Sequence, residues 1–175
     1  MASRLVSGEC TFTSGPFSNR WNLWWRGERL AEMARNSRQH TSSVTLADGT
    51  EIRLQPEGWG TVVAREGNKE WGRIVRRSWW GRRWDLVSPT FGYALTSDLM
   101  PRHWTLRVGN EPVGHLSGGI FSYNHLTIQI DVAVPVLPLV MSWHVLARPW
   151  EAASAPGALL PVDPGPGRFS RRIDD

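Results

Sequence analysis

The residues best suited to chemistry in this chain are arginines and tryptophans interleaved in the stretch WGRIVRRSWWGRRWD, from Trp71 to Asp85. It contains five arginines and one acidic residue, so its net charge of 5 − 1 = +4 equals the formal net charge of the whole chain. Guanidinium groups bind phosphates and carboxylates through paired hydrogen bonds. Indole rings lie at lipid interfaces or stack on nucleic-acid bases. The stretch therefore predicts a surface for an anionic ligand, with Arg73, Arg76, Arg77, Trp79, Trp80, Arg82 and Arg83 as the binding residues.

The same stretch is also typical of an ordinary hairpin with its arginines in water and its tryptophans in the core. Adjacent residues of a strand point to opposite faces, so the pairs Arg76-Arg77 and Arg82-Arg83 cannot all share one face. Membrane surfaces and nucleic acids both attract basic patches. The chain has no helix-turn-helix or zinc-finger spacing, so we expect an anionic membrane surface or phospholipid as the partner, and not nucleic acid.

A second aromatic and basic cluster comprises Trp21, Trp24 and Trp25 with Arg20 and Arg26. Such a cluster can anchor a protein at a membrane interface. Packing of these rings within the fold is the interpretation that we favour.

The other reactive side chains form no catalytic pattern. The five histidines are scattered without metal-ligand spacing, so we expect neither a metal nor a cofactor. His144 lies in an apolar stretch, which is typical of a hydrogen-bonded core histidine. Cys10 has no neighbouring histidine to activate it. The chain also lacks a nucleophile elbow, a P-loop and a dinucleotide-binding glycine pattern, which favours a non-enzymatic protein.

Length and composition indicate one domain of the all-β class. A chain of 175 residues is long enough for a single core, and 17 glycines and 12 prolines are typical of many turns. The single cysteine fits a reducing compartment, and the first residues have no apolar stretch of the kind found in signal peptides. We expect a monomeric cytoplasmic protein that can lie at the periphery of a membrane.

Alternating apolar residues and turn signals predict ten to twelve short strands, the spacing of a barrel or sandwich. We expect strands at about 4–13, 44–46, 52–54, 58–65, 71–77, 82–87, 91–96, 103–108, 113–116 and 123–130. Residues 27–35 are expected to form a short helix, because their apolar residues continue a stripe at helical spacing. A polar loop is expected at 35–43.

One pattern occurs twice, as GNKEWGRI from Gly67 and as GNEPVGHL from Gly109. In both copies the first glycine suits a hairpin turn. The second, Gly72 or Gly114, lies within a strand and predicts a β-bulge or a close approach of another backbone. We interpret the two copies as a repeated sheet unit.

The stretch VAVPVLPLVMSWHVLA, residues 132–147, is apolar on every side and must be surrounded by lipid or by protein. It is shorter than the ~20 apolar residues that span a bilayer, so we expect a central helix at about 132–148 inside the barrel. Asp131 is expected to cap it and Pro149 to end it. Residues 1–150 would then form one domain, and the Pro-, Gly- and Arg-rich residues 151–175 a flexible tail.

Many short antiparallel strands followed by one apolar C-terminal helix resemble the tubby C-terminal-like superfamily, which includes the phospholipid scramblase and LURP-one-related proteins. The likeness lies in the two glycine-bearing hairpins and in the step from LTIQID into VPVLPLVMSWHVLA, and it covers about residues 40–150. It implies a barrel of about twelve strands around a hydrophobic helix, with His144 inside the barrel and paired to a strand carbonyl or hydroxyl group. The lysine and arginine phosphoinositide site of tubby proteins has no match in this chain.

These observations lead to the hypothesis of a non-enzymatic barrel that binds an anionic membrane surface or lipid headgroup through the Trp/Arg-rich hairpin. Two alternatives remain open. One is a barrel, with or without enzymatic activity, that opens to bind a small molecule or an acyl chain. The other is a structural domain that docks onto another protein.

Overall fold

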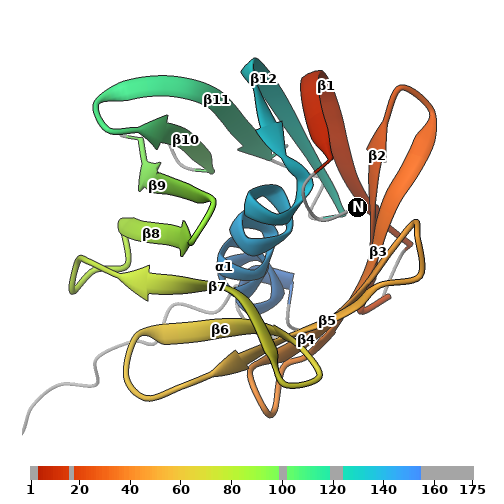
Figure 1. Cartoon of the computed structure of the whole chain (residues 1–175), viewed down its shortest axis with the longest axis vertical. Helices are drawn as coiled ribbons and strands as arrows, with labels where there is room; N and C mark the ends of the chain where they lie inside the picture. Colours follow the sequence, from red (N-terminus) through yellow and green to blue (C-terminus); the bar gives the residue numbers. More distant parts are fainter. Residues whose placement is uncertain (1–3, 16–17, 99–101, 119–123, 155–175) are drawn as a thin grey trace, which may run out of the picture.

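The computed structural model describes residues 4–15, 18–98, 102–118 and 124–154. In this part of the chain twelve antiparallel strands close into a barrel around one helix (Figure 1). The strands are β1 (Leu5–Ser14), β2 (Arg20–Trp25), β3 (Glu28–Asn36), β4 (Thr41–Leu46), β5 (Glu51–Pro56), β6 (Thr61–Glu66), β7 (Lys69–Arg76), β8 (Arg83–Ser88), β9 (Phe91–Ser97), β10 (His103–Val108), β11 (Glu111–Gly118) and β12 (His125–Pro135), and the helix is α1 (Val136–Ser154). The predicted fold class, an all-β barrel of ten to twelve strands with a central C-terminal helix, is confirmed.

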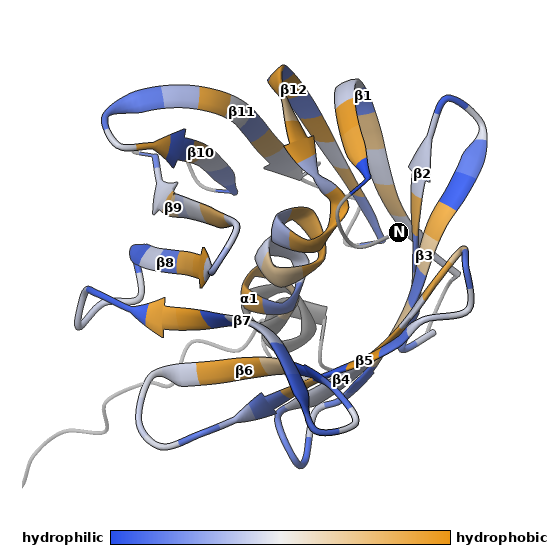
Figure 2. Ribbon diagram, viewed as in Figure 1, coloured by the Kyte–Doolittle hydropathy of each residue, from blue (hydrophilic) through white to orange (hydrophobic). Residues whose placement is uncertain are grey.

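Each strand pairs with its neighbours in sequence, and β1 pairs with β12 to close the barrel. Along most strands, buried and exposed residues alternate as the pleat requires. Figure 2 shows the resulting hydrophobic residues recurring along the strands and on α1. Because successive strands run in opposite directions, connections after odd-numbered strands lie at one end of the barrel, which we call the distal end. Connections after even-numbered strands, and the start of α1, lie at the proximal end.

The apolar stretch is enclosed by the barrel. Every residue from Val136 to Ala147 is buried, and Trp143 is the largest side chain among those that are fully buried. The backbone N–H of Val136 donates to the carbonyl of Arg4, which fastens the start of α1 to the start of β1. Among the described residues, no helix is long and apolar enough to cross a membrane.

Two predictions about the ends of this helix are wrong. Asp131 does not cap α1 but lies in β12, which continues to Pro135, so the helix follows the strand directly. Pro149 does not end α1, which extends to Ser154. A proline removes one backbone donor from a helix, and a helix can continue past that loss. Residues 151–154 belong to α1, and residues 155–175, where the rest of the tail is expected, lie outside the described part.

The helix predicted at 27–35 is also wrong, because this segment is the turn between β2 and β3 followed by most of β3. The strand has an irregularity at Leu30, so both Leu30 and Ala31 point into the core. Two consecutive inward residues break the alternation of a strand and imitate the spacing of a helical stripe. The polar loop expected at 35–43 is shorter, since β3 continues to Asn36 and β4 starts at Thr41.

Three hairpins, each four strands from the next, share this bulge. In β6–β7 the residue without a cross-strand partner is Trp71, just before Gly72. In β10–β11 it is Val113, just before Gly114. In β2–β3 it is Leu30. The two copies of the GN pattern therefore occupy equivalent places in the barrel, and the β2–β3 hairpin has the same bulge without that pattern.

Both strand glycines are also close to a neighbouring backbone. A Cβ atom built on Gly72 would lie 2.7 Å from the carbonyl oxygen of Val87, and one on Gly114 would lie 2.9 Å from that of Gln129. Real Cβ atoms essentially never approach so closely. The predicted bulge and the predicted close approach are confirmed at both positions.

Candidate functional site

The Trp/Arg-rich stretch forms a hairpin at the distal end of the barrel. Its first strand, β7, ends at Arg76, and its second, β8, begins at Arg83. Between them lie Trp79 and Trp80, whose relative exposures are 74% and 82%. The tryptophans of this stretch therefore differ in exposure, because Trp84 is buried in the core whereas Trp79 and Trp80 face the solvent.

Ser78 holds the connection between β7 and β8 in a defined shape. Its hydroxyl oxygen accepts hydrogen bonds from the backbone N–H groups of Arg82 at 2.7 Å and of Arg83 at 2.9 Å. Its carbonyl oxygen accepts from the N–H of Gly81, whose φ of +67° suits glycine. The carbonyl of Gly81 in turn accepts from the indole N–H of Trp84 at 2.8 Å. The two exposed tryptophans therefore stand on a loop with its own hydrogen-bond network.

Arg76 belongs to the support of this loop. Its guanidinium donates to the carbonyl of Ser78 at 3.0 Å and to the carbonyl of Trp79. The same group lies 5.6 Å from the ring of Trp59 and 5.7 Å from the ring of Trp84, within cation–π range. An external anion would have to compete with these contacts, so Arg76 acts mainly within the protein.

Two other arginines of the predicted set are held by carboxylates. Arg73 contacts Glu70 at 2.6 Å and Glu57 at 3.1 Å, and its hydrogen bond lowers the pKa of Glu70. Arg77 contacts Asp85 at 2.6 Å. These ion pairs are half-exposed and contribute little to stability, but they reduce the positive charge that the surface offers.

The remaining two arginines of the set, Arg82 and Arg83, begin the return of the hairpin. Arg83 is 4.0 Å from Asp85, which already pairs with Arg77. The guanidinium of Arg82 is exposed and has no partner among the described residues. Of the predicted set, the charge most accessible to an anion therefore lies on Arg82 and Arg83, with Arg77 beside them.

Trp59 is a member of this surface that the sequence analysis missed. It lies in the connection between β5 and β6, is 70% exposed, and its ring centroid is 5.8 Å from that of Trp79. Glycines flank it at positions 58 and 60. The sequence analysis placed Trp59 at the start of a strand at 58–65, whereas β6 begins only at Thr61. A large aromatic residue between two glycines is typical of a turn, and that signal could have identified it.

The proximal end differs in character. Its tight turns contain Arg26-Gly27, Asp48-Gly49, Gly67-Asn68, Pro89-Thr90 and Gly109-Asn110, and none of them carries an aromatic residue. The strongly exposed large hydrophobic side chains elsewhere are aliphatic, at Leu5, Val108 and Val132. Among the described residues, exposed indoles of this degree occur at the distal end alone.

The second aromatic cluster packs within the fold, as favoured from sequence. Trp21 lies in the core, with its ring centroid 6.2 Å from that of Trp143 on α1. Trp25 is half-buried beneath two guanidinium groups, with Arg4 at 5.2 Å and Arg26 at 4.7 Å from its ring. These rings are engaged by the protein itself.

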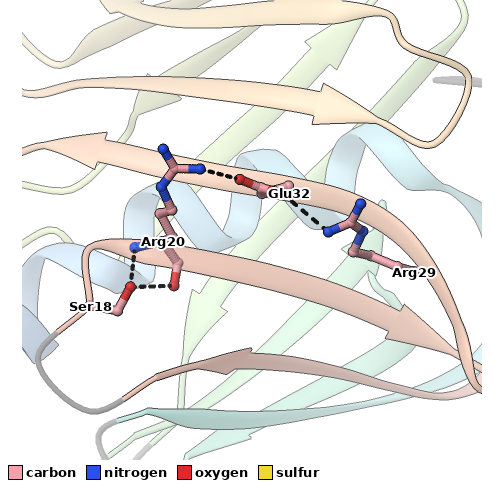
Figure 3. A network of polar contacts seen from close by, with 4 residues as sticks. All are labelled: Ser18, Arg20, Arg29 and Glu32. Atoms are coloured by element: carbon pink, nitrogen blue, oxygen red, sulfur yellow. Dashed lines mark hydrogen bonds and ion pairs between the residues drawn. The ribbon is translucent and has the colours of Figure 1, made fainter.

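Arg20, the other basic member of that cluster, lies on the outer surface of the barrel. Its guanidinium donates to Glu32 at 2.8 Å, and the other oxygen of Glu32 accepts from Arg29 at 3.2 Å (Figure 3). Ser18 accepts a hydrogen bond from the backbone N–H of Arg20. The network joins β2 to β3 and leaves little free charge.

The histidine of α1 has the role expected of a core residue. His144 Nδ1 lies 2.8 Å from the hydroxyl of Ser42 on β4, and both residues are buried. The carbonyl of His144 accepts a hydrogen bond from Arg35 at 3.2 Å. Arg35, only 4% exposed, was assigned to a polar loop from sequence and instead reaches into the barrel.

The described residues contain no group of three or more His, Cys, Asp or Glu side chains that could hold a metal ion. Cys10 is buried, and burial raises the pKa of its thiol to about 11. Because the thiolate is the nucleophilic form, the raised pKa disfavours reaction of this cysteine at neutral pH.

Comparison with known proteins gives one structural match and none in sequence. No protein-family model and no curated protein matches the chain. A crystal structure of an Arabidopsis thaliana protein matches with a TM-score of 0.55 and 9% sequence identity, over 86% of this chain and 98% of the plant protein. The two proteins share a fold. At this identity the likeness carries no information on activity.

Proposed function

We propose that this protein is a non-enzymatic barrel module that binds an anionic membrane surface through its distal end. The observation that carries the proposal is the group of three indoles, Trp59, Trp79 and Trp80, each at least 70% exposed, beside the accessible arginines Arg82 and Arg83. Exposed tryptophan is costly in water and favourable at the headgroup level of a bilayer. Arginine beside it complements anionic lipid.

The arrangement of the rest of the molecule supports the same proposal. The barrel interior is filled by buried side chains of α1, which favours a surface site over a site for a small molecule or an acyl chain inside the barrel. The resemblance to the tubby C-terminal-like superfamily is part of the proposal, and twelve strands closed around a C-terminal helix support it. We expect the protein to be cytoplasmic and to associate with membranes peripherally.

Vesicle flotation tests the proposal. The full chain should float with vesicles that contain anionic lipid at low ionic strength. The variant Arg82→Ala/Arg83→Ala should partition less, by about fivefold for each charge removed. Arg53→Ala is the single-charge control, because Arg53 is an exposed arginine within strand β5 and not in a distal connection. The proposal fails if the wild-type protein does not float, or if the control loses as much binding as the double variant.

A further inference from the structure

The three exposed indoles come from two separate connections, which lie side by side so that the indoles form one cluster. Trp59 follows β5, whereas Trp79 and Trp80 follow β7, and the rings of Trp59 and Trp79 are 5.8 Å apart at an angle of 31°. We call Trp59, Trp79 and Trp80 the tryptophan wedge. Resting on the proposed function, we propose that this wedge enters the boundary between headgroups and hydrocarbon of a loosely packed bilayer, with Arg76 holding its two halves together.

Arg76 is placed to link the two halves. Its backbone N–H donates to the carbonyl of Gly60 at 2.8 Å, next to Trp59, while its guanidinium donates to the carbonyl of Trp79. Gly60 and Gly81 allow this close fit. A Cβ atom on Gly60 would lie 3.1 Å from the Cβ of Arg76, and one on Gly81 would lie 3.4 Å from its guanidinium. One arginine thus contacts both connections, so its effect on binding is exerted through the indoles.

The charge at this end is smaller than the sequence suggests. Arg73 is paired with Glu70 and Glu57, and Arg76 is occupied by carbonyl groups and indole rings. Three arginines remain at the hairpin end, Arg77 after β7 and Arg82 and Arg83 on the return, and Asp85 faces two of them. The three arginines and Asp85 together have a net charge of 3 − 1 = +2, compared with +4 for the whole stretch.

Magnitudes then favour the indoles over the charge as the main source of affinity. A basic residue at an anionic surface is worth about a fivefold change in partition, so two net charges give about 25-fold. Burying a large apolar side chain is worth about tenfold or more, so three indoles give about a thousandfold or more. A wedge that contributes most of the affinity needs gaps between headgroups. Strongly curved or loosely packed bilayers provide such gaps. A loosely packed bilayer is therefore the partner that suits the tryptophan wedge best.

The experiment compares partitioning at low and high salt, on small strongly curved vesicles and on large vesicles of the same composition. High salt shortens the screening length to about 3 Å at 1 M and removes the contribution of charge. We expect a loss of about 25-fold for the wild type, with measurable binding left at high salt and stronger binding to the small vesicles. Trp59→Ala should weaken the salt-resistant binding by about tenfold. Leu5→Ala, which removes an exposed aliphatic side chain at the proximal end, should leave it unchanged.

The outcomes separate this inference from the proposed function. Binding to anionic vesicles that disappears entirely at high salt, or that Trp59→Ala does not change, overturns the wedge and leaves the anionic-surface proposal standing. Absence of binding to any vesicle overturns both and would favour a protein partner for the exposed indoles. Equal binding to small and large vesicles overturns the assignment to loosely packed lipid.

Discussion

Ser42 on β4 and His144 on α1, 102 positions apart in sequence, share a buried hydrogen bond of 2.8 Å between the serine hydroxyl and Nδ1. It joins the helix to the wall that encloses it, and both residues are almost fully buried, at 3% and 1% exposure. A buried polar group that loses its partner costs more than the bond itself contributes, because the group was already removed from water. The pair therefore fixes the rotation and the depth of α1 in the barrel.

Ser42→Ala should lower the free energy of unfolding by about 1–3 kcal/mol, because it leaves Nδ1 of His144 without this partner. Ser43→Ala, at the adjacent exposed position of β4, should change it by less than about 0.5 kcal/mol. Urea unfolding of both variants measures the difference. Equal stability of the two variants would contradict the role of the pair.

Gly72→Ala should destabilise the barrel by about 1–3 kcal/mol, since the new methyl group would lie 2.7 Å from the carbonyl oxygen of Val87. Gly92→Ala is the control, because this strand glycine has no atom within 4 Å of the position of a Cβ. Its substitution should be neutral or slightly stabilising. Thermal unfolding of the two variants tests the prediction, and a loss of stability in Gly92→Ala equal to that in Gly72→Ala would refute it.

Burial raises the pKa of Cys10 to about 11, above the ~8.5 of a free thiol. The folded state therefore favours the neutral thiol. This contribution to stability is fully present below about pH 8.5 and is lost as the pH rises through 11. Native protein at pH 8 should react with a thiol reagent far more slowly than protein in guanidinium chloride. Stability between pH 9 and pH 11, where the raised pKa takes effect, should fall more steeply in the wild type than in Cys10→Ala. Fast labelling of the native protein would show that the thiol is accessible.

Arg76→Lys should weaken membrane binding although it preserves the charge. Lysine lacks the planar fork that reaches the carbonyls of Ser78 and Trp79. We expect the salt-resistant part of vesicle binding to fall by about tenfold, as in Trp59→Ala, and the salt-sensitive part to stay within about twofold of the wild type. Arg82→Lys, which keeps an exposed charge, is the control and should retain both parts. If Arg76→Lys changes only the salt-sensitive part, Arg76 acts as a charge and not as a positioning residue.

Much of the candidate site was accessible from sequence. Alternating apolar residues predicted strands at 71–77 and 82–87, whose facing ends lie within a residue of the facing ends of β7 and β8. The sequence did not reveal that Arg76 is engaged by carbonyl groups and rings, because its partners follow from the shape of the loop. It also did not reveal Trp59, which reaches Trp79 because the barrel places the connection after β5 beside the connection after β7.

The class of fold follows from local patterns in the sequence. Alternating side chains along short strands and one stretch apolar on every side suffice for a barrel closed around a helix, because both patterns are local and reflect burial directly. Two other features depend on contacts between distant parts of the chain. Residues 27–35 were expected to be helical but lie mostly in β3. The bulge at Leu30 inserts one extra residue, which reverses the alternation of inward and outward side chains along the strand. Trp59 and Trp79 of the tryptophan wedge are twenty positions apart in sequence. They meet because the pairing of the strands places the connections after β5 and β7 at the same end of the barrel.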